Sequence, residues 1–301
     1  MDYFGVIKKA FKITWQNKFL WVFGILAGST AGMKGLNFQI PSNFNWQDTW
    51  NKYSSQDLSN IDWTTFWSNH GTALLILMAI LAFLAILCFV LSLMSQGALI
   101  GAVAKVEKDQ TPTFVQSFLL GWHSFWRIWG VNITLLLMIL IALSVWILPT
   151  CALVIYGAYT SAWIVGILLF LLNLAFWVLI TLISPYALRI VVLKKHSIFE
   201  SIREALHFVR DHLLSVLVTY LLLMAVGLAV GLAVILVSLF LIAILSLIGL
   251  GLFEINSIAV VFYAIIVVLS LIVVGLIFSG AYSTFTSTIL TLTYLKLIGK
   301  D

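Results

Sequence analysis

Charged residues and histidine are absent from five long stretches of the chain, and short polar segments separate these stretches. A helix crosses the apolar core of a bilayer with roughly 20 apolar residues. The first two stretches each supply one span, and the third is too long for one helix. Because Pro149 and Gly157 interrupt it, it predicts two helices, over 128–148 and 161–193. The five stretches are 19–33, 71–104, 128–188, 213–253 and 255–295.

The last two stretches are each about twice the length that one span requires. Each one predicts either a long tilted helix or a span followed by a helix on the outer interface. Gly249 and Gly251 mark 237–253 as the place where we expect such a break. Six spans are favoured over eight.

Each pair of predicted spans follows a stretch with apolar residues three or four positions apart, which is typical of an amphipathic helix. We therefore expect an all-α integral membrane protein of one domain, with six transmembrane helices arranged as three hairpins, each preceded by a cytoplasmic amphipathic helix. The units are 1–106, 107–195 and 196–301. The apolar positions are Phe4, Ile7, Phe11 and Trp15; Phe114, Phe118, Trp122 and Phe125; and Ile198, Ile202, Leu206 and Val209.

The distribution of basic residues predicts the orientation. On the six-span topology, fourteen Lys and Arg residues fall on one side and two, Lys34 and Lys52, on the other. Cytoplasmic loops carry the excess of positive charge, so both termini are expected in the cytoplasm of a multi-pass cell-membrane protein. The chain is 62% hydrophobic and 9% charged, which excludes a soluble globular protein. No basic cluster is long enough to favour nucleic-acid binding.

The predicted outer loop, 33–70, is the one long polar segment. Trp46 and Trp50 are four residues apart, as are Trp63 and Trp67. Two interpretations stay open. Short helices could rest on the outer leaflet with their indoles at the interface, or the four tryptophans could form an outer binding surface for a sugar, a lipid headgroup or a protein.

The residue types that carry catalysis are scarce. The chain lacks HExxH, Walker and GxSxG motifs, and no carboxylate lies deep in a predicted span. Cys88 and Cys151 lie in apolar sequence, without metal-ligand spacing. We therefore expect no enzyme activity, no catalytic residue, no cofactor and no metal. Four polar residues within spans could line a polar cavity or join helices: Gln96, Asn132, Asn173 and Ser184.

Glycines recur at four-residue spacing in three predicted spans. This spacing lets helices approach closely, either within one chain or between two copies of it. The residues are Gly24, Gly28 and Gly32; Gly97 and Gly101; and Gly227 and Gly231.

Three segments resemble a group of uncharacterised polytopic prokaryotic membrane proteins, which includes the membrane domain found fused to glycerophosphoryl diester phosphodiesterases. They are RIVVLKKHSIFESIREALHFVRDHLLSVL at 189–217, TSTILTLTYLKL at 286–297 and AFKITWQNKFLWVFGIL at 10–26. The resemblance implies six helices in a bacterial or archaeal cell membrane. It implies no phosphodiesterase activity, because the catalytic domain is absent from this sequence.

Three classes of function stay open. The first is a non-enzymatic scaffold, partner subunit or lipid-binding element, with membrane lipids, a protein partner or a second copy of the chain as partners. The alternative is a transporter or channel for a small or amphipathic solute. The third is a membrane-embedded enzyme, for which His207, Asp211 and His212 come nearest to a reactive cluster. The first class is favoured.

Overall fold

The computed structural model describes residues 2–32, 63–253 and 257–299, and within these ranges it contains helices and no strand. Its elements are α1 Tyr3–Gln16, α2 Phe19–Gly32, α4 Trp63–Glu107, α5 Phe114–Ile155, α6 Tyr159–Leu193, α7 Ile198–Asp211, α8 Leu213–Phe253 and α9 Ser257–Ile298.

Five helices are long and apolar enough to cross a membrane, as expected of a multi-pass membrane protein. The apolar part of α2, Phe19–Gly28, is shorter than these five. The five candidate spans are Gly71–Glu107, Phe114–Ile155, Tyr159–Leu193, Leu213–Leu245 and Ile265–Ile298.

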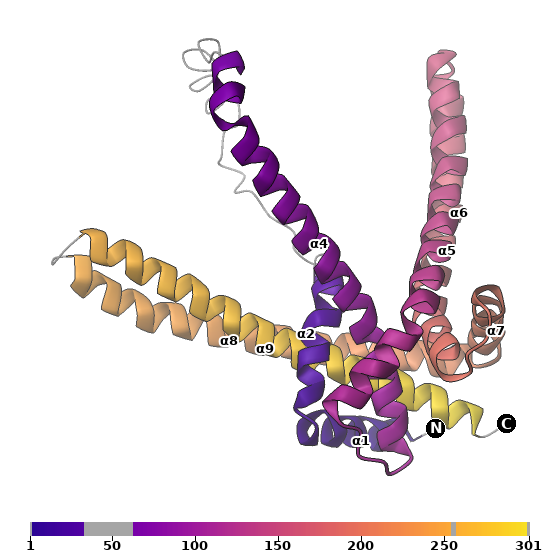
Figure 1. The fold of residues 1–301 in the computed structure, drawn as a ribbon. Coiled ribbons are helices and arrows are strands. Elements are labelled where there is room, and N and C mark those ends of the chain that lie inside the picture. The colour runs from indigo at the N-terminus through magenta and orange to yellow at the C-terminus, as the bar shows by residue number, and fades with distance from the viewer. Residues whose placement is uncertain (1, 33–62, 254–256, 300–301) are drawn as a thin grey trace.

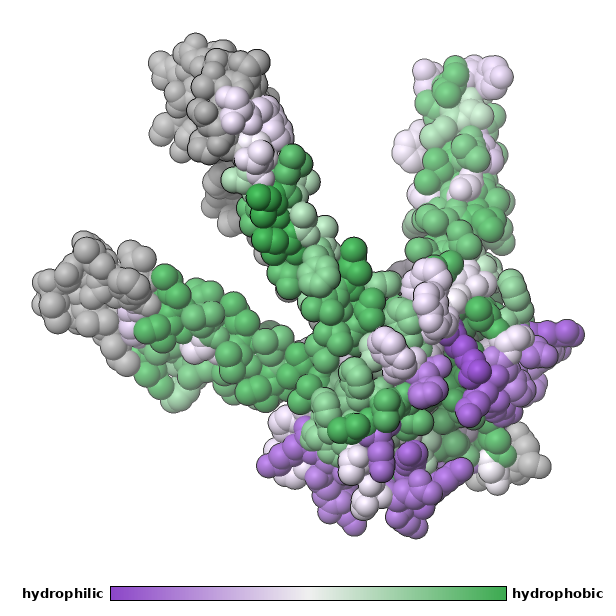
Figure 2. Space-filling view, in the orientation of Figure 1, coloured by the Kyte–Doolittle hydropathy of each residue, from purple (hydrophilic) through white to green (hydrophobic). Residues whose placement is uncertain are grey.

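Three arms diverge from one packed hub (Figure 1). We define the arms as 71–91 of α4, 136–155 of α5 with 159–179 of α6, and 224–245 of α8 with 265–279 of α9. The hub comprises α1, α2, α7 and the parts of the long helices that pack around them, 92–107, 114–135, 180–193, 213–223 and 280–298. Every buried hydrophobic side chain of the described residues except Ala162 lies in the hub. Figure 2 shows apolar arms and hydrophilic residues gathered on the hub.

The break between α5 and α6 lies further along the chain than Pro149 predicts. The α5 helix continues through Pro149 to Ile155, and the turn forms at Gly157, whose φ of 75° suits a residue without a side chain. In lipid, an unpaired backbone group costs several kcal/mol, so a helix is kept continuous where a proline would end it in water. The helix end predicted at about 148 was therefore wrong, whereas the start predicted at about 161 agrees with the observed start at Tyr159 to within two residues.

The expected break within 237–253 is also wrong, because α8 is helical throughout that range. A glycine inside a helix costs only about 1 kcal/mol relative to alanine. That cost is smaller than the cost of exposing unpaired backbone to lipid.

Two helix crossings in the hub depend on glycine. A Cβ atom on Gly24 would lie 2.1 Å from the carbonyl oxygen of Gly280, and one on Gly121 would lie 2.2 Å from that of Met94. Gly97 faces Gly121 at the second crossing. Packing within one chain thus explains the glycine spacing in α2 and α4, whereas Gly231 has no neighbour within 4 Å.

Beside a proline and at a buried arginine, α6 makes hydrogen bonds with α8 and α9. Pro185 lacks the N–H that would bond the carbonyl of Thr181, and the Tyr220 hydroxyl of α8 donates to that carbonyl at 2.9 Å. Arg189 is 3% exposed and donates to the Thr291 hydroxyl at 3.2 Å and to the Ser287 carbonyl at 3.1 Å. Side-chain and backbone groups of α8 and α9 thereby satisfy polar groups of α6.

The aromatic residues that define the first predicted amphipathic stretch face away from the hub. In α1, Phe4, Phe11 and Trp15 are exposed, while Val6 and Ala10 are buried. The second stretch is the beginning of α5 and no separate helix, and its Trp122 is exposed as well. Both stretches therefore have two apolar faces, one packed on the hub and one open.

Candidate functional site

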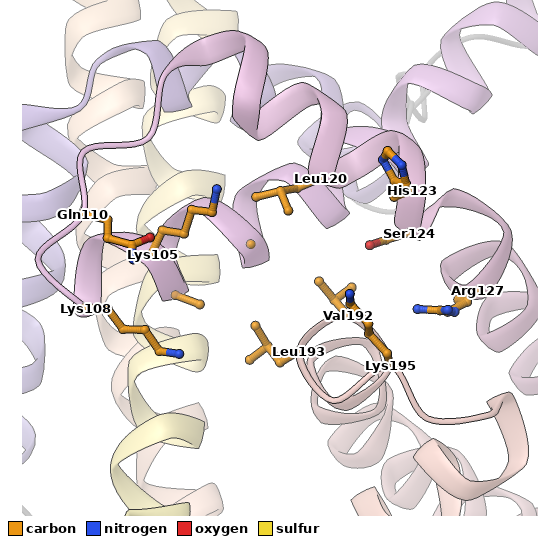
Figure 3. Close-up of a pocket in the computed structure, with 12 residues that line it drawn as sticks. Lys105, Lys108, Gln110, Leu120, His123, Ser124, Arg127, Val192, Leu193 and Lys195 are labelled. Atoms are coloured by element: carbon orange, nitrogen blue, oxygen red, sulfur yellow. The ribbon is translucent and has the colours of Figure 1, made fainter.

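A pocket of about 450 Å³ lies where α4, α5 and α6 meet in the hub. We call it the basic pocket, because four cationic side chains line it: Lys105, Lys108, Arg127 and Lys195 (Figure 3). Gln110, His123 and Ser124 add polar groups to the lining. The apolar part consists of Gly101, Ala104, Leu120, Val192 and Leu193.

The end of α4 places the first two cations. Lys105 lies in the last helical turn, and the chain then reverses through Asp109, whose φ is 57°. The backbone N–H of Gln110 donates to the Lys105 carbonyl at 3.1 Å, which closes the turn. The reversal keeps Lys108 and Gln110 beside the last turn of α4.

The end of α6 places the third cation in a similar way. Lys194 caps the helix, and Lys195 follows with a left-handed φ of 59°. Ser197 then starts α7 with a capping box in which Glu200 participates. The left-handed turn at Lys195 and the capping box at Ser197 together fix the short link between α6 and α7, and with it the backbone of Lys195.

Arg127 and Ser124 come from α5. This helix crosses α4 at close range beside the pocket. A Cβ atom on Gly101 of α4 would lie 3.1 Å from Leu120 Cδ1. Thr113 and Gln116 form a capping box that sets the start of α5. The small residues of α4 thus bring the α5 side chains over the end of α4.

Three acidic residues near the pocket are engaged elsewhere, and a further one, Asp109, lies in the turn between Lys108 and Gln110. Glu107 pairs with Lys9 of α1 at 2.8 Å, and Glu204 of α7 pairs with Lys194 and with His196. Glu200 bonds Ser197, whose hydrogen bonds hold the pKa of that carboxyl below its ordinary value. Among the residues that the structure describes, none of the four pocket cations forms an ion pair.

The pocket is therefore positive overall. Two helix ends at the pocket, those of α4 and α6, each contribute about half a negative charge. Against these stand the four cationic side chains of the lining. The excess favours an anion, and arginine in particular binds phosphate through a planar fork of donors.

The four polar residues predicted for a cavity do not share one site with these cations. The Asn132 amide donates to the Ile128 carbonyl of its own helix at 2.9 Å. Asn173 lines a second pocket of about 630 Å³ between α5 and α6, among apolar residues such as Met138 and Phe176. Gln96 and Ser184 lie half-buried in α4 and α6.

The predicted outer surface of tryptophans lies mostly outside the described residues. Trp46 and Trp50 fall in the range that is not described, and Trp63 begins α4. Trp67 is exposed in the second turn of that helix. The outer-surface hypothesis stays a prediction.

Of the cluster in α7, His212 packs its ring edge-on against Phe208, with the ring centroids 5.1 Å apart. Within the described part of the chain, no group of three or more His, Cys, Asp or Glu side chains could hold a metal ion.

Sequence reasoning missed the basic pocket because it treated the lysines only as markers of topology. A signal was present: Lys105 and Lys195 each follow a predicted span, at the same side of the membrane. Which of the fourteen cations converge could not be read from their spacing, because that depends on how the helices cross.

Compared with protein-family models, with curated proteins and with solved structures, the chain matches none of them.

Proposed function

We propose that this chain is a non-enzymatic, multi-pass protein of a prokaryotic cell membrane that binds anionic lipid through the basic pocket. In this proposal six helices span the membrane, the hub faces the cytoplasm, and both termini lie there. The observation that carries the proposal is the convergence on one pocket, at the polar end of apolar helices, of four cations that form no ion pair with any described residue. Basic pockets between helices on the cytoplasmic side suit phospholipid headgroups.

The open aromatic faces of α1 and α5 support this placement. Indole and phenyl rings favour the headgroup region of a bilayer. Phe11, Trp15 and Trp122 are exposed on the hub, and contact of their apolar surface with water would be unfavourable. The proposal places these rings, and the basic pocket of the same hub, in the headgroup region.

The second hairpin supports lipid binding as well. Its two apolar pockets lie between α5 and α6, and their linings include Met138, Leu172 and Trp146. Such surfaces fit acyl chains better than they fit a hydrated solute. This observation favours a lipid-binding element over the alternative, a transporter or channel for a small or amphipathic solute.

Native mass spectrometry of the detergent-purified protein tests the proposal, with phosphatidylglycerol and phosphatidylcholine added in turn. We expect retained phosphatidylglycerol, and a loss of at least about tenfold in its affinity when all four pocket cations are changed to Gln, because each cation contributes about 1 kcal/mol near anionic lipid. The variant is K105Q/K108Q/R127Q/K195Q.

The matched control removes four exposed cations that do not line the pocket, in K8Q/K12Q/R203Q/R210Q. We expect this control to keep phosphatidylglycerol affinity within about twofold, since it changes the net charge equally but leaves the pocket intact. Equal losses of phosphatidylglycerol affinity in the two variants would contradict specific binding in the basic pocket. Loss of binding in neither variant would favour the transport alternative, which flux assays in liposomes then address.

A further inference from the structure

We infer that the basic pocket selects a headgroup with two phosphates over one with a single phosphate; this rests on the proposed function. The pocket has two halves, each supplied by different helices. Lys105, Lys108 and Gln110 come from the end of α4 and the turn after it. Ser124, Arg127 and Lys195 come from α5 and the end of α6.

The two halves lie on opposite sides of the pocket (Figure 3). Each half contains two cations and at least one neutral polar side chain, Gln110 in the first half and Ser124 with His123 in the second, and one phosphate group can bind to such a set. Leu120 and Leu193 line the space between them. A ligand with two phosphates on a short linker would therefore place one phosphate in each half and its linker against apolar side chains.

A ligand that occupies both halves is bound more tightly than a ligand that occupies one. Once the first phosphate is bound, the second meets its half at a high effective concentration. Neither half has an acidic partner among the described residues that would compete for the cations. A lipid with a single phosphate occupies one half and leaves the other half without a partner.

The inference names a chemistry that occurs in lipids and in soluble compounds. A diphosphatidylglycerol headgroup carries two phosphates joined by glycerol, and glycerol 1,3-bisphosphate is its soluble counterpart. The apolar helices that rise from the pocket favour the lipid, because its acyl chains would extend along them.

Native mass spectrometry with diphosphatidylglycerol, phosphatidylglycerol and glycerol 1,3-bisphosphate tests the inference. For the unmodified chain we expect diphosphatidylglycerol to bind at least about tenfold more tightly than phosphatidylglycerol, since two further cations are engaged. In K105Q/K108Q, and separately in R127Q/K195Q, we expect that preference to fall to about twofold or less.

The half-pocket variants also separate headgroup from acyl chains. Diphosphatidylglycerol has more acyl chains than phosphatidylglycerol, so a preference that survives in both half-pocket variants would come from the chains and would overturn the inference. Equal affinity for the two lipids in the unmodified chain would overturn it as well, while the proposed function would stand.

Two further outcomes would contradict the lipid assignment or the proposed function. If glycerol 1,3-bisphosphate displaces the lipid at equal concentration, the pocket takes a free bisphosphate, and the lipid assignment is wrong. If neither lipid binds the unmodified chain more tightly than it binds K105Q/K108Q/R127Q/K195Q, the proposed function itself fails.

Discussion

Apolar side chains are abundant in both the hub and the arms, but their surroundings differ. In the hub, apolar side chains from several helices pack on one another, and side chains such as Tyr186 and Leu292 are fully buried. In the arms, residues such as Ile141, Leu172 and Phe240 face outward. Water would penalise the arms by roughly 25 cal/mol for each Å² of apolar surface, whereas lipid does not. The hub is therefore stabilised by protein packing, and the arms require an apolar solvent.

The two regions also differ in their polar contacts. Ion pairs and buried hydrogen bonds between helices concentrate in the hub, where Arg189 and Thr284 bond across helices. In the arms, Ser144 and Thr150 bond carbonyls of their own helix, and the Trp146 indole N–H donates to the Gly166 carbonyl of α6 within the second arm. Polar contacts thus hold the arms together at the hub and contribute little between the arms.

Glycine substitutions provide the strongest test of this comparison. We expect Gly24→Ala and Gly121→Ala to lower the free energy of unfolding by about 2 kcal/mol each, because the new Cβ meets backbone that must shift. We expect Gly231→Ala and Gly275→Ala in the arms to cause no loss, since nothing lies within 4 Å of the new atom.

Unfolding by SDS in mixed micelles measures these free energies. The arm variants are the matched control, because the chemical change is the same. Similar losses in all four variants would show that the arms pack as tightly as the hub, contrary to the structure.

A smaller effect is expected at the junction of α6 and α8. Tyr220→Phe removes the hydroxyl that bonds the Thr181 carbonyl, and we expect a loss of about 1 kcal/mol in the free energy of unfolding. In a Pro185→Ala background the loss shrinks, because residue 185 then supplies its own N–H to that carbonyl.

A double-mutant cycle of these two substitutions, followed by SDS unfolding, measures the coupling between them. The same loss in both backgrounds would mean that Tyr220 acts by packing alone and does not compensate for the proline.

The smallest effect concerns the capping box of α7. Hydrogen bonds from Ser197 lower the pKa of Glu200, so the folded state gains stability that is complete above the ordinary pKa of 4.5 and disappears as the pH falls through the lower, folded value. We expect Ser197→Ala to reduce stability at neutral pH and to flatten the acid limb of the stability curve.

Thermal unfolding followed by circular dichroism between neutral and acidic pH measures that limb. Ser144→Ala in the second arm is the control, since its hydroxyl bonds only the Leu140 carbonyl. If stability falls as steeply with decreasing pH in Ser197→Ala as in the unmodified chain, protonation of Glu200 is not the cause of that fall.

The helical class and five of the six expected spans could be predicted from the sequence. Charge-free runs of sufficient length can satisfy their backbone in lipid only as helices, so the apolar pattern determines them without reference to other parts of the chain. Gly157, rather than Pro149, ends α5 because a left-handed turn depends on local backbone geometry that composition does not reveal.

The buried hydrogen bonds of Arg189 and Tyr220, and the pocket that gathers Lys105, Arg127 and Lys195, could not be predicted in this way. Each depends on which helices cross and how closely, and those crossings form through contacts between residues far apart in the chain, such as Gly24 with Gly280. The sequence by itself determined that the chain is a set of apolar helices with cations gathered at one end. Only the tertiary structure decided which of those cations share a pocket, because convergence is a property of packed helices and not of spacing along one of them.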